Sequence, residues 1–185
     1  MTRTEYAKSV QDHYARIWSP PVDVVRWGAG PVSDLPEDFR VLVVSRSADM
    51  TAYATRCMSQ LADEDRLEIH LLAGKGQGSS SDIIEVLTAV AHYHRTGRGL
   101  GLGHSVNFGR PWVTGSTCTH GLISLPYLDG PDLEWLAEPK VRFLWLIPIT
   151  EAEVRFKKSY GMEALERKLE ERRFDFLDPS RVSVA

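Results

Sequence analysis

The side chains best suited to catalysis or metal binding are histidines and cysteines in the middle third of the chain. His104, Cys118 and His120 could supply nitrogen and sulfur ligands to one ion, or a thiol nucleophile with a histidine base. His92 and His94 resemble a ligand pair, but a helix through both would point them roughly 200° apart. We therefore expect no catalytic residue, no metal ligand and no cofactor. A small metal-dependent hydrolase that uses the first three residues is the alternative.

A glycine-rich loop at residues 74–78 lies between a predicted strand and a predicted helix, where phosphate-binding loops occur. A dinucleotide fingerprint would require a third glycine at the position that Ser79 occupies. No Gly-Lys-Ser/Thr triplet follows for a nucleoside triphosphate. The loop is therefore predicted to be a flexible surface segment.

A second glycine pattern runs through residues 97–103, where glycines alternate with Arg98, Leu100 and Leu102. If the segment is extended, one of its faces carries no side chains, and another backbone could approach closely. The other interpretation is a loose loop after the preceding helix, and the sequence leaves both open. We predict a protein-binding surface around this segment, formed by His104, Asn107, Trp112 and His120.

Hydrophobic periodicity predicts the elements that must position these residues. Apolar residues from Tyr6 to Ile17 recur at helical spacing and predict a helix within residues 1–20, which the pair Pro20-Pro21 ends. Residues 66–73 alternate and predict a strand whose wetter face carries Glu68 and His70. Further strands are expected at residues 22–27, 40–45, 50–59, 102–108 and 121–125, and one helical turn at 133–136.

Two helix starts carry capping signals. Asp82 is the expected N-cap of a helix that ends near Thr96-Gly97, with Glu85 as its capping-box partner. Residues 141–185 are predicted to form a strand–helix–helix unit, in which Pro148 ends the strand because it cannot donate to a sheet ladder. Thr150 then caps the first helix with Glu153 as partner, and Gly161 ends that helix.

Composition fits one domain, residues 1–185, with an α+β fold. Strands outnumber helices and come in runs, which favours a largely antiparallel, mixed sheet with helices packed on it. The net charge is −3 and basic residues form no stripe, so we expect no nucleic-acid binding. No apolar run approaches the length of a membrane span. Only two cysteines and no N-terminal apolar signal segment indicate a reducing cytoplasm.

Several ordered blocks of this sequence resemble the Suppressor of Fused domain family, specifically its small bacterial members. The likeness runs from about Asp23 to the C-terminus and is strongest after His92. Its blocks are HYHRTG at 92–97, LGLGHSVNFG at 100–109, LPYLD at 125–129, WLIPITEAE at 145–153, Phe156-Lys157, Gly161, FDFLDP at 174–179 and Ser183-Val184.

The resemblance implies an α+β domain without known catalysis. Animal members of the family look like intracellular adaptors that hold a transcription factor inactive, and bacterial members are similar to immunity proteins that neutralise a toxin. We therefore expect a cytoplasmic protein-binding domain that occludes a partner protein. The modest acidic balance suits a basic toxin as that partner. A homo-oligomeric structural module with exposed tryptophans is a further alternative.

Overall fold

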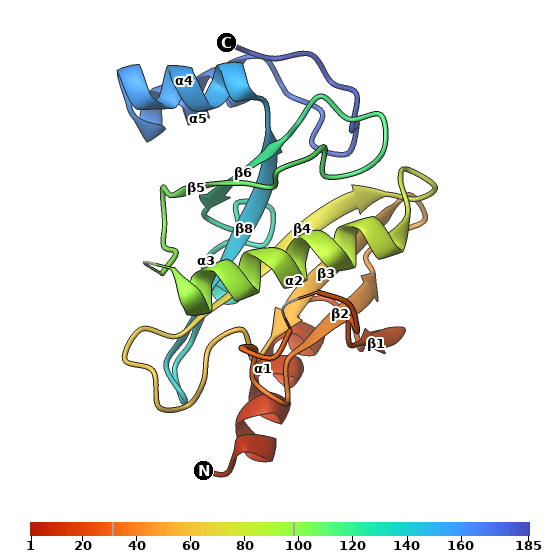
Figure 1. Ribbon diagram of the computed structural model, residues 1–185, viewed down its shortest axis with the longest axis vertical. Coiled ribbons are helices and arrows are strands. Elements are labelled where there is room, and N and C mark those ends of the chain that lie inside the picture. Colours follow the sequence, from red (N-terminus) through yellow and green to blue (C-terminus); the bar gives the residue numbers. More distant parts are fainter. Residues whose placement is uncertain (31, 98) are drawn as a thin grey trace.

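The computed structural model describes residues 1–30, 32–97 and 99–185, and it is organised around one mixed sheet (Figure 1). The strand order is β1-β2-β3-β4-β8-β6-β5, and the short β7 also pairs with β8. Among the strand pairs of the described residues, only β4–β8 is parallel. The strands are β1 (Asp23–Val25), β2 (Arg40–Ser45), β3 (Met50–Arg56), β4 (Leu67–Gly74), β5 (Ser105–Asn107), β6 (His120–Ser124), β7 (Trp135–Leu136) and β8 (Val141–Ile149). This α+β architecture confirms the predicted fold class.

Helices cover both faces of the sheet. α2 crosses one face, where it packs with Ile69, Ile123 and Leu144 in a common core (Figure 1). α1 covers part of the opposite face, and α4 and α5 cover the remainder. None of the helices in the described ranges has both the length and the apolarity needed to cross a bilayer. The helices are α1 (Arg3–Ile17), α2 (Ser80–Thr96), α3 (Pro131–Glu134), α4 (Glu151–Tyr160) and α5 (Met162–Glu171).

The prediction of a wetter face on β4 is wrong. Glu68 is 0% exposed and His70 is 1% exposed. α1 and the residue after it lie over this face: the Tyr14 hydroxyl donates to the Ile69 carbonyl at 3.4 Å, and the Trp18 ring meets the His70 ring edge-on at 5.2 Å. Polar residues at alternate positions therefore reflect a buried polar layer here and not a solvated surface.

The strand–helix–helix unit is confirmed, with one correction. The Thr150 amide donates to a Glu153 carboxylate oxygen at 2.7 Å, and the Glu153 amide donates to the Thr150 hydroxyl at 3.3 Å, which completes the capping box. However, β8 continues through Pro148 to Ile149. β4 pairs with β8 only up to Trp145, so beyond that point β8 has a partner strand on one side alone, where proline is tolerated.

One other local prediction is wrong, and one of the two interpretations of residues 97–103 is excluded. The N-cap of α2 is Ser79, whose hydroxyl accepts from the Ser81 amide at 3.2 Å, and Asp82 lies within the first helical turn. The extended interpretation of residues 97–103 fails because Gly99 and Gly103 have positive φ angles of 74° and 81°, which extended strands do not adopt. β5 therefore begins at Ser105. The predictions that include Arg98 and Pro31 lie outside the described residues at those two positions.

Candidate functional site

The open edge of the sheet at β5 is the candidate functional site. β5 is the last strand of the sheet and pairs only with β6, with Val106 opposite Gly121 and Asn107 opposite His120. The carbonyl of His104 accepts from the Ile123 amide at 2.9 Å, and the Phe108 amide donates to the Thr119 carbonyl at 3.0 Å.

These two bonds fix the direction of every backbone group along the edge. Residues of an antiparallel pair alternate between those bonded to the neighbouring strand and those that face away. Since the groups at 104 and 108 face β6, the N–H and C=O groups of Ser105 and Asn107 face the open side. An unpaired row of this kind is a template on which another strand can add.

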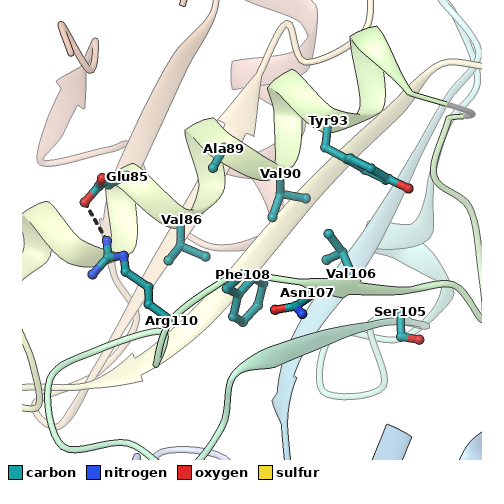
Figure 2. Close-up of a pocket in the computed structure, with 10 residues that line it drawn as sticks. All are labelled: Glu85, Val86, Ala89, Val90, Tyr93, Ser105, Val106, Asn107, Phe108 and Arg110. Carbon is teal, nitrogen blue, oxygen red and sulfur yellow. Dashed lines mark hydrogen bonds and ion pairs between the residues drawn. The ribbon is translucent and has the colours of Figure 1, made fainter. Parts of the chain in front are cut away.

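A cleft beside this edge separates β5 from α2 (Figure 2). Its volume is about 290 Å³. Val86 and Val90 line it from the helix, Val106 lines it from β5, and Phe108 lines it from the position directly after β5. Tyr93, which is 48% exposed, lies at the end of the cleft nearest the C-terminus of α2. The cleft therefore offers an apolar floor directly next to unpaired backbone groups.

Charged side chains close the other end of the cleft. The Arg110 guanidinium donates to Glu85 at 2.5 Å and lies 3.7 Å from Asp82, so the loop after β5 is tied to the first turns of α2 (Figure 2). Both acidic residues and the arginine are partly exposed, which makes this an ordinary surface ion pair of modest strength. Glu85 and Arg110 line the cleft at this end.

The start of β5 is held by α4. The Lys157 ammonium group donates to the Gly103 carbonyl, and it lies 3.3 Å from the Ser105 hydroxyl. Burial lowers the pKa of Lys157 from its ordinary value. A side chain at Gly103 would approach the Met162 sulfur to 2.9 Å, so the loop before β5 also packs closely on α5. The edge is therefore presented by a rigid support and not by a free loop.

Three of the four predicted binding residues lie at or beside this edge. His104 immediately precedes β5, and Asn107 and His120 form a cross-strand pair. The Asn107 side-chain oxygen accepts from the Gly109 amide at 2.7 Å, which shapes the turn after the strand. Burial lowers the pKa of His120 and so favours its neutral imidazole.

The fourth predicted residue, Trp112, belongs to the interior. It is 1% exposed and packs in the core cluster of α2 with Cys118, so it does not contribute to the accessible surface. The sequence around Trp112 does not reveal whether its loop packs against the core. The predicted tryptophan face for a homo-oligomer does not assemble either, because Trp135 is the only exposed tryptophan of the five, all of which lie in the described ranges.

The metal site that the hydrolase alternative requires is not formed by the described residues. No group of three or more histidine, cysteine or acidic side chains is placed to hold a metal ion there. Cys118 is buried, and burial raises the pKa of its thiol, which is opposite to the change that activates a nucleophile. His92 and His94 face different partners, Asp34 at 3.1 Å and the Leu100 amide at 2.9 Å, as expected for two positions two apart on a helix.

Sequence reasoning missed the helical wall of the cleft. Val86 and Val90 of α2 belong to the core, and they also line the opening. Ala89 and Tyr93 continue this surface outward, and both are exposed. An exposed tyrosine one turn beyond an apolar stretch was the available signal.

Comparisons with known proteins agree on one family. The family model described as "Suppressor of fused protein (SUFU)" matches residues 19–182. The chain is similar to a solved SUFU homologue from Neisseria gonorrhoeae FA 1090, with 32% identity, a TM-score of 0.84 and coverage of 98% of both chains. No curated protein matches the chain.

Two more distant structures share the fold. The solved Sufu–Fu complex matches with 16% identity and a TM-score of 0.72, over 97% of this chain and 92% of that one. Drosophila Suppressor of Fused matches with 15% identity and a TM-score of 0.68, over 97% of this chain and 51% of that one. At these identities the likeness establishes the fold alone.

Proposed function

Because this chain belongs to the Suppressor of fused family, we propose that it is a non-catalytic protein-binding domain that receives its partner at the open edge of β5. The observation that carries the proposal is the outward direction of the Ser105 and Asn107 backbone groups beside an apolar cleft. One of the relatives is named as a complex of Sufu with Fu, which supports protein binding as the family's use of this fold.

The proposed mode is addition of a strand from the partner. An extended segment would bond to the N–H and C=O groups of Ser105 and Asn107, and this main-chain pairing supplies affinity. Side chains of a strand alternate, so every second side chain of the partner would reach the cleft between Val90 and Phe108. The small apolar cleft then selects medium-sized apolar residues at those positions.

Paired substitutions at Asn107 test this mode. Asn107→Ala removes the side chain and its bond to the Gly109 amide but keeps the outward N–H, whereas Asn107→Pro also removes that N–H. Neither disturbs the ladder with β6, because residue 107 faces away from it. We expect affinity capture from the native host to recover a protein that the wild type and Asn107→Ala retain and Asn107→Pro loses.

If Asn107→Pro retains every protein that Asn107→Ala retains, strand addition at this edge is contradicted. Circular dichroism and thermal unfolding of both variants establish that they remain folded. A captured protein counts as the partner only if Asn107→Ala retains it and Asn107→Pro does not. A protein that the wild type and both variants bind equally must bind elsewhere on the surface.

The finer role that we propose is that of an immunity protein that neutralises a basic toxin in the cytoplasm. The net charge of −3 favours a basic partner, and two buried, unpaired cysteines fit a reducing compartment. In cells whose growth is arrested by a toxin encoded beside the gene, co-expression of this protein should restore growth. Co-expression of Asn107→Pro should not. Failure of the wild type to protect against any neighbouring effector would remove the immunity role without removing protein binding.

A further inference from the structure

A largely apolar groove with a volume of about 600 Å³ lies on the sheet face opposite α2. Trp145 and Ile147 of β8 form its floor, and α5 forms one wall. Tyr127 and Leu128 form the other rim, and Phe174 lines it after the end of α5. We call this hollow the α5 groove.

The floor of the α5 groove carries a buried hydrogen-bond donor without an acceptor. Trp145 is 4% exposed, and its indole Nε1 has no partner among the described residues. Buried indole N–H groups normally find an acceptor, and an orphaned one calls for an explanation. The rings around it, His70 at 6.5 Å and Phe176 at 5.3 Å between centroids, hold the indole in place. The indole N–H groups of Trp18 and Trp112 are buried without a partner among the described residues in the same way, so the Trp145 ring contributes to the groove as a fixed apolar floor.

The rim of the α5 groove carries exposed apolar side chains. Tyr127 is 57% exposed and Leu128 is 49% exposed, side by side in one loop. Asp129, the next residue, forms a bidentate ion pair with Arg46, at 2.6 and 3.2 Å, which fixes this loop against the sheet. Adjacent exposed apolar side chains beside a hollow mark an interaction surface.

Charge on the α5 wall indicates what would occupy the groove. Glu163 and Glu170 lie seven positions apart on α5, both are exposed, and neither forms an ion pair within the described chain. Glu166 lies between them and accepts from the Ser124 hydroxyl at 2.5 Å. Three carboxylates and two guanidinium groups, Arg167 and Arg173, line the groove, so its balance is acidic.

We propose that the α5 groove is a second protein-docking surface, which takes an apolar peptide segment that carries lysine or arginine. Aliphatic side chains of the segment would pack on Leu128 and Ile147, and its basic side chains would pair with Glu163 and Glu170. The unpaired carboxylates of Glu163 and Glu170 favour this basic segment over a fatty acid, whose own carboxylate they would repel.

The first test uses two short blocked peptides, one of alternating leucine and lysine and one of alternating leucine and glutamate. The leucine–lysine peptide should bind, and the leucine–glutamate peptide should bind on the order of tenfold or more weakly. Leu128→Asp should weaken the binding of the first peptide by a similar factor. Val22→Asp is the matched control, because Val22 is also apolar and exposed, at 70%, but lies before β1, far from the groove in the sheet order.

The second measurement follows the Trp145 indole by NMR. Trp145→Phe assigns its N–H signal among the five indoles, and in the wild type this signal should shift on addition of the leucine–lysine peptide, because the peptide packs on the groove floor, while the Trp112 signal stays fixed. Asn107→Pro should leave these results unchanged, so failure here and failure of the β5 proposal are separable.

Three outcomes would overturn the proposal. They are equal binding of the two peptides, binding that Leu128→Asp does not affect, and a fixed Trp145 signal when the peptide is bound. A dimer in sedimentation that Leu128→Asp converts to monomer would assign the groove to a second copy of the chain instead.

Discussion

A buried carboxyl group, Glu68, is the most unusual single residue of this fold. It is 0% exposed and accepts from the Thr55 hydroxyl at 2.6 Å, the Met58 amide at 3.1 Å and the Ser59 amide at 3.5 Å. The loss of solvation raises the pKa of Glu68 to about 7, against the opposing effect of these donors. Glu68 therefore ties the turn after β3 to β4 and titrates near neutral pH.

We predict that Glu68→Gln removes a pH dependence of stability. The folded-state pKa of about 7 exceeds the ordinary value of 4.5, so the stabilising contribution is fully present below pH 4.5 and is lost as the pH rises through 7. Over this range the free energy of unfolding of the wild type should fall by roughly 3 kcal/mol relative to Glu68→Gln. Urea unfolding between pH 4.5 and 8 measures this difference.

Glu171→Gln, which changes an exposed carboxyl group on α5, is the control and should keep the wild-type pH dependence. Parallel pH curves for the wild type and Glu68→Gln would show that Glu68 does not titrate in this window.

At the scale of elements, Gly121 of β6 allows side chains from β8 and from the residue after β5 to approach β6 closely. A Cβ atom there would lie 2.4 Å from the Leu146 Cδ1 atom and 2.7 Å from the Phe108 Cζ atom. Both contacts are side-chain ends, so they can shift, but Phe108 is also a wall of the β5 cleft. The absence of a side chain at this position therefore shapes both the core and the candidate site.

Gly121→Ala should destabilise the fold by about 1–3 kcal/mol through overpacking, and it should displace Phe108 into the cleft. Chemical denaturation measures the first effect, and NMR chemical shifts of the Phe108 ring measure the second. Gly101→Ala, where a Cβ atom meets nothing within 4 Å, should change neither. Equal stability of the two variants would mean that β6 and β8 are not packed as described.

The C-terminal segment is fastened to α4 by a buried ion pair. The Arg181 guanidinium donates to both Glu153 carboxylate oxygens, at 2.7 and 2.8 Å, and Glu153 is 0% exposed. Burial alone would raise the pKa of Glu153, but the bonds from Arg181 outweigh it and hold this pKa below its ordinary value. Glu153 is also the capping-box residue of α4, so one carboxylate joins the helix start to the last residues of the chain.

Arg181→Ala should therefore cost about 3–5 kcal/mol in the free energy of unfolding, because it leaves a buried carboxylate without its cation. Arg155→Ala, which breaks an exposed pair with Glu151, should cost less than about 1 kcal/mol. Denaturant titrations of the two variants test the contrast. A loss of similar size in both would place Arg181 among ordinary surface cations.

The sequence predicted elements well where the signal is local. β2 spans the predicted residues 40–45, because its run of valines and leucine is buried on both faces, and the Thr150 capping box depends on residues only three apart. The predictions failed where an element distant in the sequence determines whether a residue is buried. Glu68 and His70 are buried by α1 and the residue that follows it, which lie some fifty residues earlier in the chain, and no pattern within β4 reveals that cover.

The candidate site shows the same division. His104, Asn107 and His120 were identified from sequence, but their relation to an open edge follows from the order of the strands, which places β5 last although it is fifth in the chain. Strand order depends on long-range pairing, as between β4 and β8, which local periodicity does not encode. Trp112 was misplaced for the same reason, since its burial depends on how its loop folds against α2.

For the whole molecule, one sheet supports two separate surfaces. The edge at β5 offers unpaired backbone beside a narrow cleft, and the α5 groove lies on the opposite face of the sheet. They are connected through the packed loop before β5, where Lys157 of α4 holds Gly103, and Gly103 lies against Met162 of α5. If both proposals hold, one partner could bind to the β5 edge and to the α5 groove at the same time.

Amide hydrogen exchange at Ser105 and Asn107 tests the central claim most directly. Both amides face the open side of β5, so in the free protein they should exchange rapidly, while the Val106 amide, which faces β6, should be protected. Binding of the captured partner should slow exchange at Ser105 and Asn107. Unchanged exchange at both residues in a complex that is otherwise formed would contradict binding by strand addition at this edge.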